Sequence, residues 1–196
     1  MDNLGQSLSN TADRLKNGEV GVLATDTLYG LVGRAREPKA VERIYALRKR
    51  ELDKPLITLI ADKSDMAKFG VKLDSRMAMF LDRVWPGPVS VIVPVEANEF
   101  SYIHRGTKSI AFRVPAKKEL HELLELTGPL VAPSANLAGE PPAKTVDEAK
   151  GYFGDEVFYV DEARIEGAAS ALVDIRTNPP RVLRTAPGFN VSDMLH

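Results

Sequence analysis

The sequence comprises 196 residues, of which 44% are hydrophobic, and its formal net charge is -1 at pH 7. This length and composition predict one domain over residues 1–196 with an ordinary hydrophobic core, and the charge excludes a protein that is basic over its whole surface. The absence of cysteine excludes disulfides, thiolate metal sites and a cysteine nucleophile.

The N-terminal segment predicts a helix, a strand and a polar turn. Apolar residues recur at helical spacing between residues 4 and 15, and Gly18 follows as a helix stop. Residues 20–24 predict a short apolar strand. Residues 25–31 then combine hydroxyls, a carboxylate and a tyrosine with glycine, which indicates either a ligand-binding turn or a structural turn closed by an aspartate side chain.

The next predicted helix covers residues 41–48, and a cluster of basic residues lies at its C-terminal end. Arg48 continues the apolar stripe of this helix, so its guanidinium should point inward. Arg48 and Arg50 can converge on one anion only if the helix ends near Lys49, and Lys54 could then join them. Such a cluster suits a triphosphate. Alternatively, these cations only complement the helix dipole and remain solvated.

The rest of the chain predicts helices between strands. Helices are expected at 66–69, 75–84, 119–127 and after Thr145, and strands at 56–61, 89–94, 109–114, 130–132, 157–160, 170–175 and 181–185, with a loop over 96–107. Helices between strands indicate an α/β fold, and the closely spaced late strands indicate that part of the sheet is antiparallel.

Two of these strands carry polar residues that could form a site. Ser109 and Arg113 alternate onto one face of their strand, which faces either water or a ligand. Ser134 and Asn136 directly follow a buried strand, where open sheets usually bind ligands, although such residues also make turns and caps. No Walker loop, dinucleotide fingerprint or HExxH motif appears, and the three histidines lack partners at metal-ligand spacing, so no protein metal site is predicted.

Taken in order, several segments resemble the YrdC/TsaC family of threonylcarbamoyl-AMP synthases. The matching segments are Thr25-Asp26-Thr27-Leu28-Tyr29-Gly30-Leu31, Arg48-Lys49-Arg50 through Lys54-Pro55-Leu56, Trp85-Pro86-Gly87-Pro88-Val89-Ser90, Ala111-Phe112-Arg113-Val114-Pro115, Ala132-Pro133-Ser134-Ala135-Asn136 with Gly139 and Pro141, and the tail segments 169–174 and 182–184. Each motif is loose alone, but together they span nearly the whole chain. The resemblance implies a YrdC-like α/β fold, with a twisted, mixed parallel/antiparallel open sheet flanked by helices.

The resemblance also implies a reaction. Threonine and bicarbonate would form an N-carboxylated threonine, whose carboxylate attacks the α-phosphate of ATP and releases pyrophosphate. The product, L-threonylcarbamoyladenylate, would pass to downstream threonylcarbamoyl-transferase proteins that modify adenosine next to the tRNA anticodon. A site with arginines and hydroxyls suits this step, because two anions must be brought together.

Residue roles follow from the same resemblance. Arg48 and Arg50 would be catalytic. The residues expected to bind ATP are Arg48, Arg50, Lys54, Ser109, Ser134, Asn136, Lys144 and Arg184. The residues expected to bind threonine are Thr27, Arg113 and Ser170. Mg²⁺ is expected to arrive with ATP.

The chain departs from the family pattern in three places. Arg48 stands where lysine is usual, and Ala24 and Glu51 stand where proline is common. The length resembles that of the short family form, which would need partner proteins for transfer to tRNA. A domain that uses carbamoyl phosphate, as in hydrogenase-maturation proteins, fits less well, because such domains normally sit in much larger chains.

An alternative function is a non-catalytic RNA-binding module. Between residues 34 and 54 there are eight Lys or Arg (34, 36, 39, 43, 48, 49, 50 and 54) and four acids (37, 42, 51 and 53). This local basic patch could also allow a synthase to contact tRNA. No segment has the pattern of a signal peptide or the length of a membrane span, so we expect a cytoplasmic protein without membrane contact.

Overall fold

A computed structural model describes residues 2–49 and 55–188. Its helices are α1 (Asp2–Lys16), α2 (Pro38–Arg48), η1 (Lys63–Phe69), α3 (Ser75–Val84), η2 (Asn98–Phe100), α4 (Ser101–His104), α5 (Lys118–Thr127) and α6 (Val146–Phe153), where η marks 3-10 helices. Its strands are β1 (Gly21–Ala24), β2 (Tyr29–Arg34), β3 (Ile57–Leu59), β4 (Val89–Pro94), β5 (Ser109–Arg113), β6 (Leu130–Val131), β7 (Phe158–Tyr159), β8 (Ala171–Asp174) and β9 (Arg181–Arg184). Within the described ranges, none of the helices has the length and apolar character that crossing a membrane requires.

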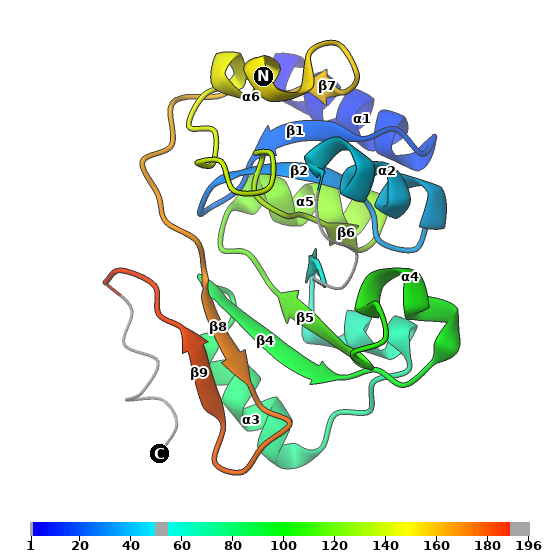
Figure 1. Cartoon of the computed structure of the whole chain (residues 1–196), viewed down its shortest axis with the longest axis vertical. Coiled ribbons are helices and arrows are strands. Elements are labelled where there is room, and N and C mark those ends of the chain that lie inside the picture. The colour runs from blue at the N-terminus through cyan, green and yellow to red at the C-terminus, as the bar shows by residue number, and fades with distance from the viewer. Residues whose placement is uncertain (1, 50–54, 189–196) are drawn as a thin grey trace.

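The strands form one sheet in the order β7-β1-β2-β6-β3-β5-β4-β8-β9. The pairs β1–β7, β3–β5 and β4–β8 are parallel, and the other neighbouring strands are antiparallel. Figure 1 shows β1 and β2 at the top of the molecule and β8 and β9 at the bottom. The mixed open sheet with flanking helices is the fold class that the sequence predicted.

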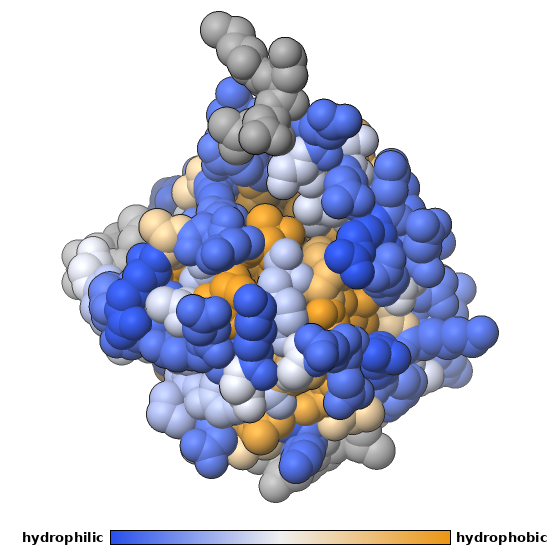
Figure 2. Space-filling model, turned by 90° about the horizontal axis from the view of Figure 1, so that it is seen from above, coloured by the Kyte–Doolittle hydropathy of each residue, from blue (hydrophilic) through white to orange (hydrophobic). Residues whose placement is uncertain are grey.

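Two hydrophobic clusters hold the helices to this sheet. The smaller cluster packs α1 and α5 together, with Leu15, Leu120 and Leu124 all buried. The larger cluster includes residues of α2, α3, α4 and α6, and it contains Phe69, whose ring lies 5.1 Å from that of Phe112. Seen from above, polar side chains cover most of the surface, and apolar residues appear in the hollows between them (Figure 2).

Helix α2 directs one arginine toward the middle of the molecule. Val41, Ile44 and Arg48 are buried on its inner stripe, as their spacing predicted. Lys49 adopts a left-handed conformation, with φ of 50°, and its backbone N–H donates to the carbonyl of Ala46 at 3.1 Å. The helix therefore ends where the convergence of Arg48 and Arg50 requires, although Arg50 itself lies outside the described residues.

The structure differs from the prediction around residues 25–34 and 96–107. Tyr29 begins a strand that the sequence did not reveal, because Gly30 and Gly33 weaken the strand pattern. Gly33 lies against α2, where a β-carbon would be 3.2 Å from the Ile44 side chain. Gly33 therefore allows β2 to pack closely against α2. The predicted loop over 96–107 contains the short helices η2 and α4, which are too brief to show a helical period.

An ion pair at the end of β8 predicts a pH-dependent contribution to stability. Arg176 donates from Nε and Nη2 to the two carboxylate oxygens of Asp174, at 2.9 and 2.7 Å. These bonds lower the pKa of Asp174 from its ordinary value. Since the folded pKa is the lower one, the stabilisation is complete above the unfolded pKa near ~4 and is lost as the pH falls through the folded pKa.

We therefore expect Asp174→Asn to reduce the free energy of unfolding by about 1 kcal/mol at pH 7, a value that allows for the partial exposure of Arg176. The deficit should shrink between about pH 5 and pH 3. Urea titrations of both proteins across this range measure it. A deficit that does not change with pH would contradict the assignment.

Candidate functional site

A cavity of about 130 Å³ opens where several segments meet near the centre of the sheet. The β1–β2 turn, the C-terminal ends of α2 and β5, the loop after β6 and the segment before β8 all contribute to its wall. Its polar lining includes Thr25, Thr27, Arg48, Arg113, Ser134, Ser170 and Arg184. The cavity therefore combines guanidinium groups with hydroxyls, a combination suited to an anionic ligand that also carries hydroxyl or amino groups.

The β1–β2 turn is built by its own hydroxyls. Thr25 Oγ1 donates to the carbonyl of Leu28 at 2.7 Å and accepts from the backbone N–H groups of Thr27 and Leu28, both at 3.1 Å. The two threonine hydroxyls also lie 3.1 Å apart, within hydrogen-bond distance. This side-chain-to-backbone turn fixes Thr27 in the cavity wall.

Arg113, the last residue of β5, places a buried cation beside this turn. Its Nη1 donates to Asp26 Oδ1 at 2.6 Å, and its Nη2 lies 3.3 Å from Thr27 Oγ1. The side chains of Arg113 and Asp26 are only 5% and 12% exposed. The other carboxylate oxygen of Asp26 accepts from the backbone N–H of Ala116 at 3.0 Å. Asp26 thus ties the β1–β2 turn to the end of β5 and to the segment that precedes α5.

Sequence reasoning did not assign Asp26 to the site, because an aspartate in a turn also has a purely structural explanation. Asp26 and Arg113 are 87 residues apart in the chain, and only the fold brings them together. The sequence offered only a weak indication of a role for Asp26, namely its position between two threonines in the polar turn over residues 25–31.

Ser170 and Arg184 form another part of the wall. The Ser170 hydroxyl lies 2.9 Å from that of Ser90 on β4, and both side chains are buried. Arg184 on β9 donates from Nε to the Ser170 carbonyl at 2.8 Å. The pairing of β8 with β4 and β9 therefore sets the position of both residues.

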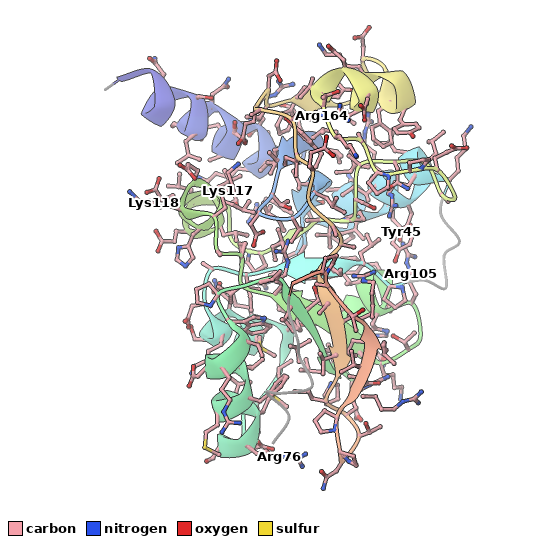
Figure 3. The ribbon with its side chains drawn as sticks, turned by 90° about the vertical axis from the view of Figure 1, so that its left-hand side faces the viewer. Tyr45, Arg76, Arg105, Lys117, Lys118 and Arg164 are labelled. Atoms are coloured by element: carbon pink, nitrogen blue, oxygen red, sulfur yellow. The ribbon has the colours of Figure 1, made fainter. Side chains whose placement is uncertain are left out.

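The segment 160–170, called the strap below, connects β7 to β8 and passes over the β1–β2 turn. Figure 1 shows it running along the outside of the molecule between the top and bottom parts, and Figure 3 labels Arg164 on it. The Tyr29 hydroxyl donates to the Glu162 carbonyl at 2.8 Å, and burial raises the pKa of Tyr29, so this donor keeps its proton. Glu166 pairs with Lys144 at 2.6 Å and with Arg164, and these cations lower its pKa to about 2. The strap is thus anchored on the first residue of β2 and on the segment that precedes α6.

Gly167 of the strap packs directly against the β1–β2 turn. A β-carbon at Gly167 would lie 2.0 Å from the carbonyl oxygen of Thr27, an overlap that requires the strap or the turn to move. Gly167→Ala should therefore displace Thr27. The KM for a substrate that contacts Thr27 should rise about tenfold, since small displacements of binding groups weaken binding. Because this overlap is with a backbone atom of the buried Thr27, the unfolding free energy should also fall, by about 1–3 kcal/mol.

A matched control is Gly151→Ala in α6, because a β-carbon there meets no atom within 4 Å. This variant should leave the KM for the same substrate unchanged. Steady-state kinetics of the two variants, together with urea titrations, separate displacement of the turn from loss of stability. Identical KM values in both variants would exclude a role of the strap in shaping the site.

Arg48 holds the loop that follows β6. Its Nε donates to the Asn136 carbonyl at 3.0 Å, and its Nη2 lies 3.0 Å from Asn136 Oδ1 and 3.4 Å from Ser134 Oγ. Asn136 in turn donates from Nδ2 to the carbonyls of Leu137 and Glu140. Arg48 therefore lines the cavity and also fixes the shape of the loop that carries Ser134.

A family model for Sua5/YciO/YrdC proteins, whose description is telomere recombination, matches residues 13–186. The chain belongs to the Sua5/YciO/YrdC family. The threonylcarbamoyl-AMP synthase of Pyrococcus abyssi is 32% identical over 174 residues, which cover 87% of this chain and 51% of that protein. The threonylcarbamoyl-AMP synthase of Idiomarina loihiensis is 33% identical over 172 residues, which cover 84% of this chain and 87% of that protein.

A solved structure of a Sua5/YciO/YrdC protein has the same fold. The crystal structure of P. abyssi Sua5 complexed with L-threonine matches with a TM-score of 0.88 at 28% identity, covering 95% of this chain and 56% of that chain. This chain thus spans about half the length of the P. abyssi protein and most of the length of the I. loihiensis protein. The family and the YrdC-like fold that the motifs indicated are confirmed.

The structure brings most of the predicted site residues of this Sua5/YciO/YrdC protein together. Those that line one cavity are Thr27, Arg48, Arg113, Ser134, Ser170 and Arg184. Asn136 lies directly behind this lining, where it is held by Arg48. Arg50 and Lys54 lie outside the described residues. The binding roles assigned to all of these residues remain predictions.

Two predicted ATP-binding residues lie away from the cavity lining. Ser109 is the first residue of β5, about 13 Å from Arg113 along an extended strand, and its hydroxyl donates to Thr107 Oγ1 at 3.2 Å. Lys144 precedes α6, and its ammonium pairs with Glu166 on the strap. Their predicted contacts with a nucleotide stay predictions.

In the described part of the basic segment, residues 34–49, three cations make contacts within the fold. Arg34 donates from Nε to the Thr127 carbonyl, Arg43 donates to the Glu156 carbonyl, and Arg48 is buried. Some of its cations therefore serve the fold, which leaves fewer of them for an RNA surface than the sequence alone suggested.

Proposed function

We propose that this protein is a threonylcarbamoyl-AMP synthase, which makes L-threonylcarbamoyladenylate and pyrophosphate from L-threonine, bicarbonate and ATP. The observation that carries the proposal is the buried guanidinium of Arg113 in a cavity that it shares with threonine and serine hydroxyls and with two further arginines. The names of the P. abyssi and I. loihiensis relatives support it, as does the threonine in the P. abyssi Sua5 complex.

The threonine would lie at the Arg113 end of the cavity. A guanidinium pairs with a carboxylate through parallel charged hydrogen bonds, and the hydroxyls of Thr27 and Ser170 can bond the amino and hydroxyl groups of the substrate. Both hydroxyls belong to rigid elements, since Thr27 is held by the β1–β2 turn and Ser170 by its contact with Ser90.

The phosphates of ATP would lie toward Arg48, Ser134 and Arg184. Arg50 and Lys54, which are also predicted to bind phosphate, lie outside the described residues. Arginine offers paired donors to phosphate oxygens, which accounts for a cluster of cations at this end. ATP would enter as its Mg²⁺ complex. Among the described residues there is no group of three or more His, Cys, Asp or Glu that could hold a metal ion, so phosphate oxygens and water are the expected ligands of this Mg²⁺.

The chemistry then consists of two steps. The threonine amine condenses with bicarbonate, with loss of water, to give an N-carboxylate. One oxygen of this group attacks the α-phosphorus of ATP, and the bond to the pyrophosphate oxygen breaks. Two anions must approach each other, so the cavity contributes charge neutralisation and orientation. The attacking group is already a carboxylate and has no proton to lose, so this step needs positioning and charge neutralisation more than a general base.

The adenylate would be the substrate of downstream threonylcarbamoyl-transferase proteins that modify tRNA adenosine next to the anticodon. A mixed anhydride of a carbamate and a phosphate is readily hydrolysed, so a rapid hand-over is expected. Direct contact with tRNA through exposed cations of the 34–54 segment belongs to the same proposal.

The decisive experiment measures pyrophosphate release from ATP with threonine and bicarbonate, leaving out each in turn and replacing threonine by serine. Release should require all three substrates and should fall with serine. Release that does not depend on threonine would overturn the proposal. Salt-sensitive RNA binding without any ATP binding would instead favour the RNA-binding module.

A further inference from the structure

We propose that Asp26 is a positioning residue, which holds the Arg113 guanidinium in the orientation that receives the threonine carboxylate. This inference rests on the proposed function, because it assigns the ligand of Arg113. It starts from the contacts of the Asp26 carboxylate, which spans two structural elements: Oδ1 accepts from Arg113 Nη1 at 2.6 Å, and Oδ2 accepts from the Ala116 backbone N–H at 3.0 Å.

These two contacts fix the carboxylate at both oxygens. Its position is therefore set by the backbone that leads into α5, and the position of Nη1 follows from it. Thr27 Oγ1 lies 3.3 Å from Nη2 and adds a weaker contact on the next nitrogen. A guanidinium is planar, so fixing Nη1 and Nη2 fixes the whole plane.

The nitrogen that remains is Nε. Within the part of the chain that the structure describes, Arg113 Nε is buried and has no hydrogen-bond partner. A buried donor without a partner is unfavourable, and a ligand that accepts from it removes that penalty. Asp26 therefore occupies one side of the guanidinium and leaves the Nε–Nη2 edge without a carboxylate.

Arg176 shows in the same molecule what this edge can hold. It grips the Asp174 carboxylate with Nε and Nη2, at 2.9 and 2.7 Å. Arg113 has the same edge, formed by Nε and Nη2, and Arg113 is one of the residues that line the cavity. A substrate carboxylate that reaches this edge would complete the same two-bond arrangement.

A purely electrostatic role and a positioning role of Asp26 predict opposite effects of Asp26→Asn on threonine binding, so the two roles can be distinguished. Asp26 cancels the charge of Arg113, so by charge alone Asp26→Asn should make the site more attractive to threonine. As a positioning residue, Asp26 uses two acceptor oxygens. Asparagine has only one acceptor oxygen, so one of the two contacts is lost and threonine should bind more weakly.

The experiment compares Asp26→Asn and Asp26→Glu with the unmodified protein, using steady-state kinetics and calorimetric titration with L-threonine. We expect Asp26→Asn to raise both the KM and the Kd for threonine about tenfold, with kcat and the KM for ATP changing less than about threefold. Asp26→Glu, which keeps two acceptor oxygens and the charge, should recover part of the loss. The matched control is Asp174→Asn, which breaks an arginine–aspartate pair that lies away from the cavity lining.

Each outcome decides a definite point. A threonine Kd that is unchanged or lower in Asp26→Asn overturns the positioning role, as does an equal rise in the control. A parallel rise in the KM for ATP indicates general disruption of the site and also overturns it. If the unmodified protein binds threonine but releases no pyrophosphate, the proposed function fails. The Kd values for threonine then still test the positioning role of Asp26. If it binds no threonine, both fail.

Discussion

Replacing Arg113 by alanine should raise the KM for threonine about a hundredfold or more while changing the KM for ATP much less. The guanidinium is almost fully buried, so its charged hydrogen bonds are made away from water. Removing one partner of such a buried charged contact costs about 2–5 kcal/mol, which corresponds to a factor of roughly 30 to several thousand in binding. Initial rates of pyrophosphate release, with each substrate varied in turn, measure both constants.

Loss of stability must be separated from loss of binding, because Arg113→Ala also leaves the Asp26 carboxylate without its cation. Arg113→Lys keeps the charge but not the planar fork, so it should fold more stably and still bind threonine poorly. Arg176→Ala provides the matched control, since it removes the guanidinium of an arginine–aspartate pair that does not line the cavity. Equal increases in the KM values for threonine and ATP would contradict a division of the site into a threonine end and a phosphate end.

Elements with a strong hydrophobic period were predictable from the sequence almost to the residue. Helix α3 over Ser75–Val84 and strand β4 over Val89–Pro94 have the bounds that were predicted. Strand β2 was missed because its glycines serve tertiary packing, a purpose that a local pattern does not show. Helix α4 was missed because its four residues are too few for a period to appear. Local patterns thus predict elements that are stabilised mainly by their own amphipathic faces.

The site was only partly predictable, for a related reason. The inward position of Arg48 follows from spacing within one helix and was predicted. The helix end near Lys49 was the condition on which Arg48 and Arg50 could converge, and the structure has it. The contacts that build the cavity join residues far apart in the chain: Asp26 with Arg113, Ser90 with Ser170, and Arg48 with Asn136. The order of strands in the sheet determines these pairs, and a single sequence does not contain that order in readable form.

Shared strand faces illustrate the same limit. Ser109 and Arg113 alternate onto one face of β5, as predicted, but they stand at opposite ends of the strand. A common face therefore does not imply a common site. Distance along the strand matters as much as the side to which a residue points.

Replacing Arg48 by alanine should have the second large effect, and its interpretation requires a partner variant. Arg48 lines the cavity and also donates to Asn136 and approaches Ser134, so its loss would disturb the loop even without a phosphate contact. Hydrogen bonds to a charged group contribute about 1.5–3 kcal/mol each, so Arg48→Ala should reduce the unfolding free energy by about 2–4 kcal/mol. Arg48→Lys keeps a cation at this position and should fold more stably.

Asn136→Ala separates the two roles of Arg48, because it removes the same side-chain contact from the other partner and leaves the guanidinium in place. If Arg48 binds phosphate, Arg48→Ala should raise the KM for ATP about a hundredfold, and Asn136→Ala only about tenfold. If Arg48 only holds the loop, the two variants should raise it by similar factors, because Asn136→Ala keeps the backbone contact of Arg48 but also loses the amide bonds to the Leu137 and Glu140 carbonyls. Phosphate binding would then fall to Arg50 and Lys54. A higher KM for ATP in Asn136→Ala than in Arg48→Ala would instead make the amide, and not the guanidinium, the group that contacts the nucleotide.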